Sequence, residues 1–166
     1  MKYYEIQQEV YQNKINRNFN ILDIGKEITL MTEEFGELCD AYIKNDAPEI
    51  KDAIGDLMIY CLGLAALFKQ NSDEITNNKI DLPENPNSLK DYLPYVGREI
   101  GMMAKTYKKS NRKPINKIDK KEIFIAHTGN LIAYLSSMFK FIGADENSEL
   151  KKIIDNNKIR THAAKI

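Results

Sequence analysis

Cysteine is scarce in this sequence. Cys39 and Cys61 are the only two cysteines in 166 residues, and they form neither a CxxC pair nor a zinc-ligand spacing. A disulfide framework needs more cysteines than this, so the pattern favours reduced thiols in a cytoplasmic protein.

An excess of charge and a long hydrophobic run are also lacking. Lys and Arg total 24, as do Asp and Glu, so we expect neither a nucleic-acid nor a membrane partner from net charge, and any electrostatic function must come from local clustering. The longest apolar run, residues 53–68, is shorter than the ~20 residues of a membrane span and contains Asp56. The polar N-terminus, residues 1–19, has no apolar core typical of a signal peptide. We therefore expect a soluble cytoplasmic protein.

Signals for strands are missing as well. The sequence shows no sustained apolar/polar alternation and no Asn-Gly or Asp-Gly hairpin turn. Apolar residues instead recur with helical periodicity, and Pro48 is well placed to begin a helix. An all-α fold follows, with helices predicted over residues 2–18, 24–44, 48–70, 89–109, 120–141 and 149–160.

Two segments of the chain resemble each other. GDLMIYCL (55–62) matches GNLIAYLS (129–136), and EEFGELCDAY (33–42) can be aligned with YVGREIGMMA (95–104), which places Glu37 over Glu99. We interpret this as a degenerate duplication of a helix pair; the alternative is chance similarity between two amphipathic hairpins. The duplication predicts one domain over residues 1–166, with a four-helix-bundle core and flanking N- and C-terminal helices. Residues 1–70 form its acidic half, 71–88 a polar linker and 89–166 the degenerate second half.

The two halves differ in their acidic residues. Four acids of the first half are replaced in the second, namely Glu33 by Tyr95, Glu34 by Val96, Asp52 by Ala126 and Asp56 by Asn130. Only the first half therefore keeps a full set of carboxylates, which predicts one site per chain.

The acids of the first half are expected to converge. On a helical wheel, Glu34 falls within the apolar arc of helix 24–44, Glu37 at its edge and Glu33 just outside it. Asp56 is the one charged residue within residues 53–68, and Asp52 lies one turn earlier on the same side. An antiparallel hairpin would bring these carboxylates into one small volume.

Such a cluster has a physical cost that a metal ion would offset. Carboxylates that share a site raise one another's pKa values and weaken folding near neutral pH. Mg²⁺ prefers oxygen ligands and keeps waters and substrate phosphates in its shell. The acids are therefore interpreted as a Mg²⁺ site, with Mn²⁺ as the alternative ion. Two simpler interpretations stay open, a solvated Glu33 and an Asp52 that serves the first turn of its helix.

The acidic pattern resembles a known family. EExxE on one helix, followed by GD at the start of an apolar run, is similar to the MazG-like all-α nucleoside triphosphate pyrophosphohydrolases, which are related to the dimeric dUTPases. The residues that carry the resemblance are Glu33, Glu34, Glu37, Asp52 and Asp56. The family's usual second motif is ExxD, whereas this chain has Ala53 three residues before Asp56, so the role of Asp52 is in doubt.

The resemblance implies hydrolysis of an NTP or dNTP between its α and β phosphates, which gives the monophosphate and pyrophosphate. It assigns Glu34, Glu37 and Asp56 as metal ligands, with Asp52 as a ligand or an acceptor behind the ligands. Glu33 is the candidate that orients or deprotonates the attacking water.

Candidate groups for the phosphates lie near the C-terminus. Segment 155–160 (DNNKIR) resembles the family's late Asn-x-x-Lys/Arg segment, which assigns substrate binding to Asn157, Lys158 and Arg160. The alternative is an ordinary polar tail. The basic run YKKSNRKP (107–114) is equally ambiguous and is more often a solvated helix end, and His127 is expected to be a packed side chain rather than a ligand.

Two further functions are kept as alternatives. One is a phosphoribosyl-ATP pyrophosphohydrolase-like enzyme, although the second half of the chain argues against it. The other is a non-catalytic helical-bundle interaction protein, which the missing glutamate at position 53 favours. A homodimer is also kept open, because apolar segments such as LSSMFKFI (135–142) would need covering.

Overall fold

The chain folds into helices, as the sequence predicts. A computed structural model describes residues 3–76 and 80–159. Within these residues there is no strand, and the α-helices are α1 (Tyr3–Asn16), α2 (Ile24–Lys44), α3 (Ala47–Leu67), α4 (Ser72–Ile75), α5 (Leu93–Lys109), α6 (Lys121–Phe141) and α7 (Glu146–Ile159), with 3₁₀ turns η1 (Leu89–Asp91) and η2 (Ile115–Lys117). None of the described helices is long and apolar enough to cross a membrane.

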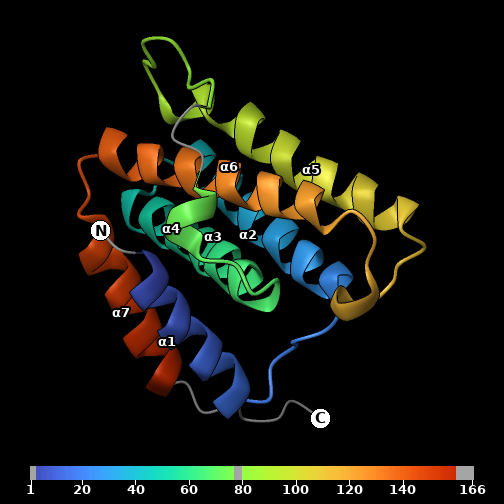
Figure 1. Cartoon of the computed structure of the whole chain (residues 1–166). Helices are drawn as coiled ribbons and strands as arrows, with labels where there is room; N and C mark the ends of the chain where they lie inside the picture. The colour runs from blue at the N-terminus through green and yellow to red at the C-terminus, as the bar shows by residue number, and fades with distance from the viewer. Residues whose placement is uncertain (1–2, 77–79, 160–166) are drawn as a thin grey trace.

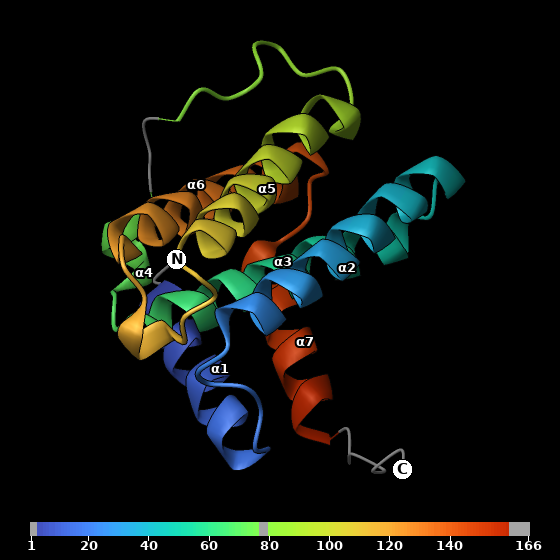
Figure 2. The same cartoon turned by 90° about the vertical axis from the view of Figure 1, so that its right-hand side faces the viewer.

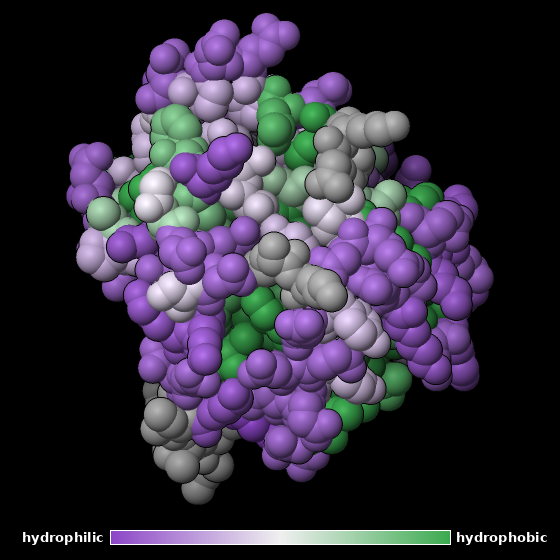
Figure 3. All heavy atoms as spheres, turned by 60° about the vertical axis from the view of Figure 1, so that its left-hand side comes forward, coloured by the Kyte–Doolittle hydropathy of each residue, from purple (hydrophilic) through white to green (hydrophobic). Residues whose placement is uncertain are grey.

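The core is a bundle of four helices. The α2–α3 pair packs against the α5–α6 pair through α2–α5 and α3–α6 contacts, and Figure 1 shows the two pairs stacked on each other. Helices α1 and α7 pack against α3 from its other side (Figure 2). The face in Figure 3 is covered mainly by hydrophilic side chains, with separate apolar areas between them. A four-helix core with flanking terminal helices is therefore the observed architecture.

Local chemistry explains the tight α2–α3 hairpin. Asn45, in the left-handed conformation (φ 56°), ends α2, and its N–H donates to the carbonyls of Ala41 and Tyr42. The side chain of Asp46 then accepts the Glu49 N–H and caps α3, and Pro48 follows within the first turn. Asparagine tolerates the left-handed region, and aspartate is a favoured N-cap. This two-residue turn places the acids of α2 opposite those of α3.

The predicted helix bounds differ from the structure by no more than three residues, except in two segments. The helix predicted over residues 89–109 is split into η1 and α5, because Pro94, in the first turn of α5, has no N–H to continue the ladder from the preceding turn. The predicted linker contains α4, which is held by distant contacts: the Ser72 N–H donates to Gln7, and the backbone N–H groups of Tyr3 and Tyr4 donate to Asp73.

The aligned glycines of the two halves both allow close packing. A Cβ atom at Gly55 would overlap the side chain of Ile153 on α7, and one at Gly129 would overlap the backbone carbonyl of Ile75 on α4. In each half, therefore, another helix packs closely against the aligned glycine: α7 against α3 and α4 against α6.

We expect Gly129→Ala to destabilise the protein by about 1–3 kcal/mol, because the backbone of α4 must move to admit the methyl group. Gly101→Ala is the matched control, since a Cβ there meets no atom within 4 Å. Alanine at this exposed position of α5 should stabilise the helix by roughly 0.5–1 kcal/mol. Urea unfolding of both variants checks the opposite signs, and equal effects would contradict the packing argument.

Candidate metal and nucleotide site

The structure brings the predicted acids of the two helices together. Glu33, Glu34 and Glu37 lie on α2, Asp52 and Asp56 lie on α3, and the two helices pack along their length. All of these acids except Glu34 line a cleft of about 580 Å³, whose lining residues are Glu33, Gly36, Glu37, Asp40, Ala41, Lys44, Asp46, Glu49, Asp52, Ala53 and Asp56. Seven carboxylates and one ammonium group line this cleft, which is therefore strongly acidic.

The pKa of Glu34 shows that the other four acids act on its carboxyl group. Burial, followed in order of effect by the charges of Asp56, Glu37, Glu33 and Asp52, raises its pKa from 4.5 to about 7. All four neighbours therefore act on one half-buried carboxyl group. This is the convergence that the helical spacing predicts.

The carboxylate oxygens of the five acids are suitable ligands for a hard cation, but their side chains do not surround a common point in this structure. Within the described residues, no group of three or more His, Cys, Asp or Glu side chains could hold a metal ion as it stands. The five acids nevertheless supply the oxygen donors that Mg²⁺ prefers. Their unfavourable interaction at Glu34 is of the kind that a bound cation relieves.

Sequence reasoning missed a buried ion pair near the acids. Lys14 of α1 donates from Nζ to both carboxylate oxygens of Glu27, each at 2.9 Å, and the two side chains are 9% and 0% exposed. The same Nζ lies 5.8 Å from the centre of the Tyr60 ring. Burial, followed by the charges of Glu34 and Glu27, raises the pKa of Tyr60. Lys14 is thus paired with Glu27, and Tyr60 stays a neutral neighbour of Glu34.

Lys44 was also missed. It lines the cleft at the last turn of α2 and pairs with Asp40, but both side chains are more than half exposed. An exposed pair of this kind contributes little to stability and exchanges readily. Lys44 is the one cation among the lining residues.

The second half has a neutralised counterpart of the acid cluster. Glu99, aligned with Glu37, is buried and accepts hydrogen bonds from Arg98, from Asn130 at 3.1 Å and from the ring of His127. Burial acts to raise the pKa of Glu99, but the hydrogen bonds from His127, Asn130 and Arg98 outweigh it and lower the pKa. His127 is therefore a partner of Glu99, not only a packed side chain. In this half, hydrogen bonds from neighbouring side chains therefore stabilise the negative charge of the buried Glu99.

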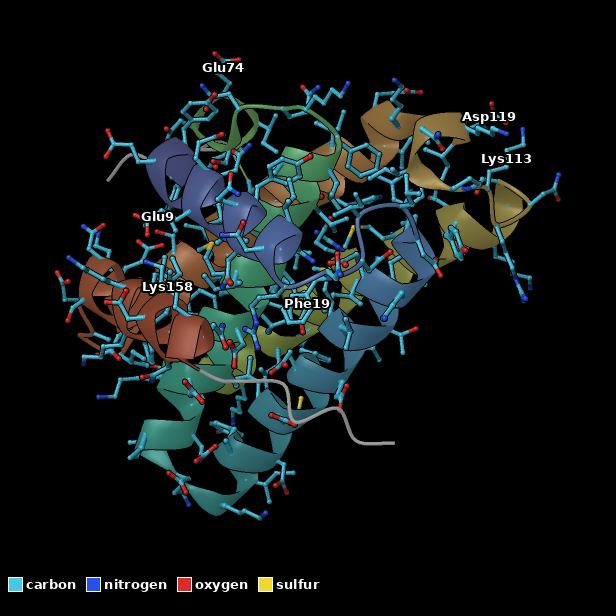
Figure 4. The ribbon with its side chains drawn as sticks, turned by 90° about the horizontal axis from the view of Figure 1, so that it is seen from below. Glu9, Phe19, Glu74, Lys113, Asp119 and Lys158 are labelled. Carbon is cyan, nitrogen blue, oxygen red and sulfur yellow. The ribbon has the colours of Figure 1, made fainter. Side chains whose placement is uncertain are left out.

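The predicted phosphate-binding residues lie elsewhere. The carbonyl oxygen of Asn157 accepts a hydrogen bond from Arg17 at 2.6 Å, and Lys158 pairs with Glu9 and Asp155 on the surface (Figure 4). Neither residue lines the cleft. Arg160 lies outside the described residues.

Comparisons with known protein families, curated proteins and solved structures gave no match for this chain.

The pH dependence of the unfolding free energy should show the cost of ionising Glu34 in the folded protein. Because its pKa is raised, the folded metal-free protein loses stability as pH rises from about 4.5 through 7. Glu34→Gln should therefore stabilise the metal-free protein at pH 8 and have little effect at pH 5. We expect about 1 kcal/mol, since solvent screens this half-exposed group. Urea unfolding in a chelator measures the effect, with exposed Glu84→Gln as the control, and a gain independent of pH would refute it.

Glu99 should behave in the opposite way. Its lowered pKa means that the ionised form stabilises the fold above the ordinary value of 4.5, and that this contribution is lost as pH falls through the folded pKa. Glu99→Gln should cost about 1–3 kcal/mol at pH 7, because its buried partners lose a charged acceptor. The same unfolding experiment should show the loss shrinking below pH 4.5. A stabilised variant at pH 7 would contradict the assignment.

Proposed function

We propose that the protein is a Mg²⁺-dependent nucleoside triphosphate pyrophosphohydrolase. The observation that carries this proposal is the gathering of five carboxylates, from α2 and α3, whose charges meet at Glu34 beside an acidic cleft. Repulsion among carboxylates does not stabilise a hairpin that has only a structural role. A cation site, in contrast, requires several carboxylates close together.

The acidity of the cleft limits the substrates that it can take. A triphosphate is polyanionic and would be repelled by seven lining carboxylates unless cations accompanied it. A bound Mg²⁺ or Mn²⁺ would supply positive charge that neutralises the phosphates and polarises the scissile bond, and it would lower the pKa of the attacking water. Lys44 adds an exposed cation in the same cleft.

The resemblance to the MazG-like enzymes supplies the bond that breaks and the role of each residue. Glu34, Glu37 and Asp56 would hold the ion, with Asp52 as a further ligand or as an acceptor behind the ligands. Glu33, exposed on the cleft wall, would take a proton from the attacking water. The water oxygen bonds to the α-phosphorus, the bond from that phosphorus to the bridging oxygen breaks, and pyrophosphate leaves with the electron pair.

Asp56→Asn is the sharpest test of this site. The protein is incubated with Mg²⁺ and each NTP, each dNTP or a phosphoribosyl nucleotide, and an NTP or dNTP should release pyrophosphate rather than phosphate. The substitution should reduce release by at least about 100-fold, because a charged oxygen ligand is lost. Asp81→Asn, at an exposed residue outside the cleft, is the matched control. Mg²⁺ should also raise the melting temperature of the wild type more than that of Asp56→Asn.

The outcomes separate the alternatives. Pyrophosphate release that survives Asp56→Asn would refute the site assignment. Release from a phosphoribosyl nucleotide alone would favour the phosphoribosyl-ATP pyrophosphohydrolase-like enzyme. No release from any nucleotide would favour a non-catalytic interaction protein, which the alanine at cleft position 53 supports.

A further inference from the structure

The connection between α5 and α6 concentrates positive charge. Eight of the 24 cationic residues of the chain lie between residues 105 and 121, against a single acid, Asp119. We call this set the basic turn; its members are Lys105, Lys108, Lys109, Arg112, Lys113, Lys117, Lys120 and Lys121. The chain as a whole is neutral, so this is a strong local imbalance.

Most of these cations are free to meet a ligand. Lys113 is half-buried and pairs with Asp119 at 2.7 Å (Figure 4). The other seven side chains are exposed, and none forms an ion pair with another residue in the described part of the chain.

The backbone of the basic turn is anchored from beneath. Ile115 and Ile118 are 8% and 5% exposed, and the Ile115 N–H donates to the carbonyl of Leu22 at 2.8 Å. At the end of α5, the hydroxyl of Ser110 donates to the carbonyl of Tyr107 at 2.7 Å. Buried Ile115 and Ile118 therefore fix the backbone, and the lysines on either side of Ile118 in the sequence are exposed on the surface.

Helix stability does not explain all of these cations. Lys108 and Lys109 lie at the C-terminus of α5, where a positive charge is favourable. Lys120, however, is the N-cap of α6, has φ 60° and makes no capping hydrogen bond, and Lys121 follows in the first turn. Positive charge at a helix N-terminus is unfavourable, and lysine is not a favoured N-cap. These two lysines oppose local stability, which points to another role.

We propose that the basic turn binds the phosphodiester backbone of nucleic acid through charge, without reading its sequence. Binding of this kind needs exposed cations and polar side chains but no apolar anchor. No large hydrophobic side chain is exposed between residues 105 and 121, whereas the exposed amides of Asn111 and Asn116 lie among the cations. The basic turn itself therefore offers no apolar core to a protein interface, and Leu22 is an exposed apolar residue next to it.

The neutral net charge does not oppose this proposal. The acids that balance the basic turn line the cleft, and the α2–α3 turn and the α5–α6 connection lie at opposite ends of the bundle (Figures 1 and 2). The two surfaces are therefore electrostatically separate. The proposal does not rest on the nucleotide chemistry of the cleft.

Fluorescence anisotropy with a short labelled duplex of mixed sequence tests the proposal. Affinity should fall by about 10³-fold between 50 and 200 mM salt if roughly six phosphates are contacted. The triple variant Lys108→Glu, Lys109→Glu, Arg112→Glu should abolish binding at low salt. The control triple Lys90→Glu, Lys151→Glu, Lys152→Glu changes the net charge equally at exposed positions outside the turn and should retain most of the affinity.

A second variant separates binding from folding. Lys120→Gly with Lys121→Ala removes the left-handed lysine and two cations from the N-terminus of α6, so it should raise the melting temperature. The same variant should weaken duplex binding several-fold and make the salt dependence less steep by about two phosphate contacts.

Three results would overturn the proposal. These are no salt-dependent binding of the duplex, equal loss of binding in the two triple variants, and binding of phosphatidylglycerol vesicles without binding of the duplex. Asp56→Asn should bind the duplex like the wild type, so failure of the enzymatic proposal is distinguishable from failure of this one.

Discussion

The repulsion among the carboxylates of α2 and α3 is the constraint around which the first half of this protein is arranged. Burial raises the pKa of the single carboxyl of Glu34, and the charges of the other four acids raise it further. The buried cation Lys14 is already paired with Glu27. The hairpin that creates this cluster is fixed by an asparagine and an aspartate in its turn. The fold therefore holds charge in a place where, without a cation, it reduces stability.

The second half shows how the same architecture behaves without such repulsion. Glu99 is more deeply buried than Glu37, yet its pKa is lowered, because His127, Asn130 and Arg98 donate to it. Aspartate at the position of Asn130 would add a charge there, whereas the amide donates a hydrogen bond. The paired glycines Gly55 and Gly129 each admit a crossing segment at the same position. The two halves thus share a close-packed glycine but differ in whether protein groups donate to their acids, and the duplication itself stays a prediction.

Helix type and most helix positions could be predicted because their causes are local. The predicted limits of the helix over residues 24–44 agree with α2, since Asp23 and Asn45 cap its ends. Segment 72–75 was predicted as part of a linker, because a helix of four residues has no periodicity to detect. It forms α4 through contacts with Gln7, Tyr3 and Tyr4, about 70 residues away along the chain.

The sequence by itself determined the helical fold and the placing of the acids, because positions three and four residues apart share one face of a helix. It could not determine the partners of those acids. Lys14 reaches Glu27, and His127 reaches Glu99, only when separate helices pack. Lys44 lines the cleft, whereas Asn157 and Lys158 do not. Contacts between helices depend on the direction in which each helix leaves its turn and on the side chains that its neighbours present, and these are properties of the assembled core.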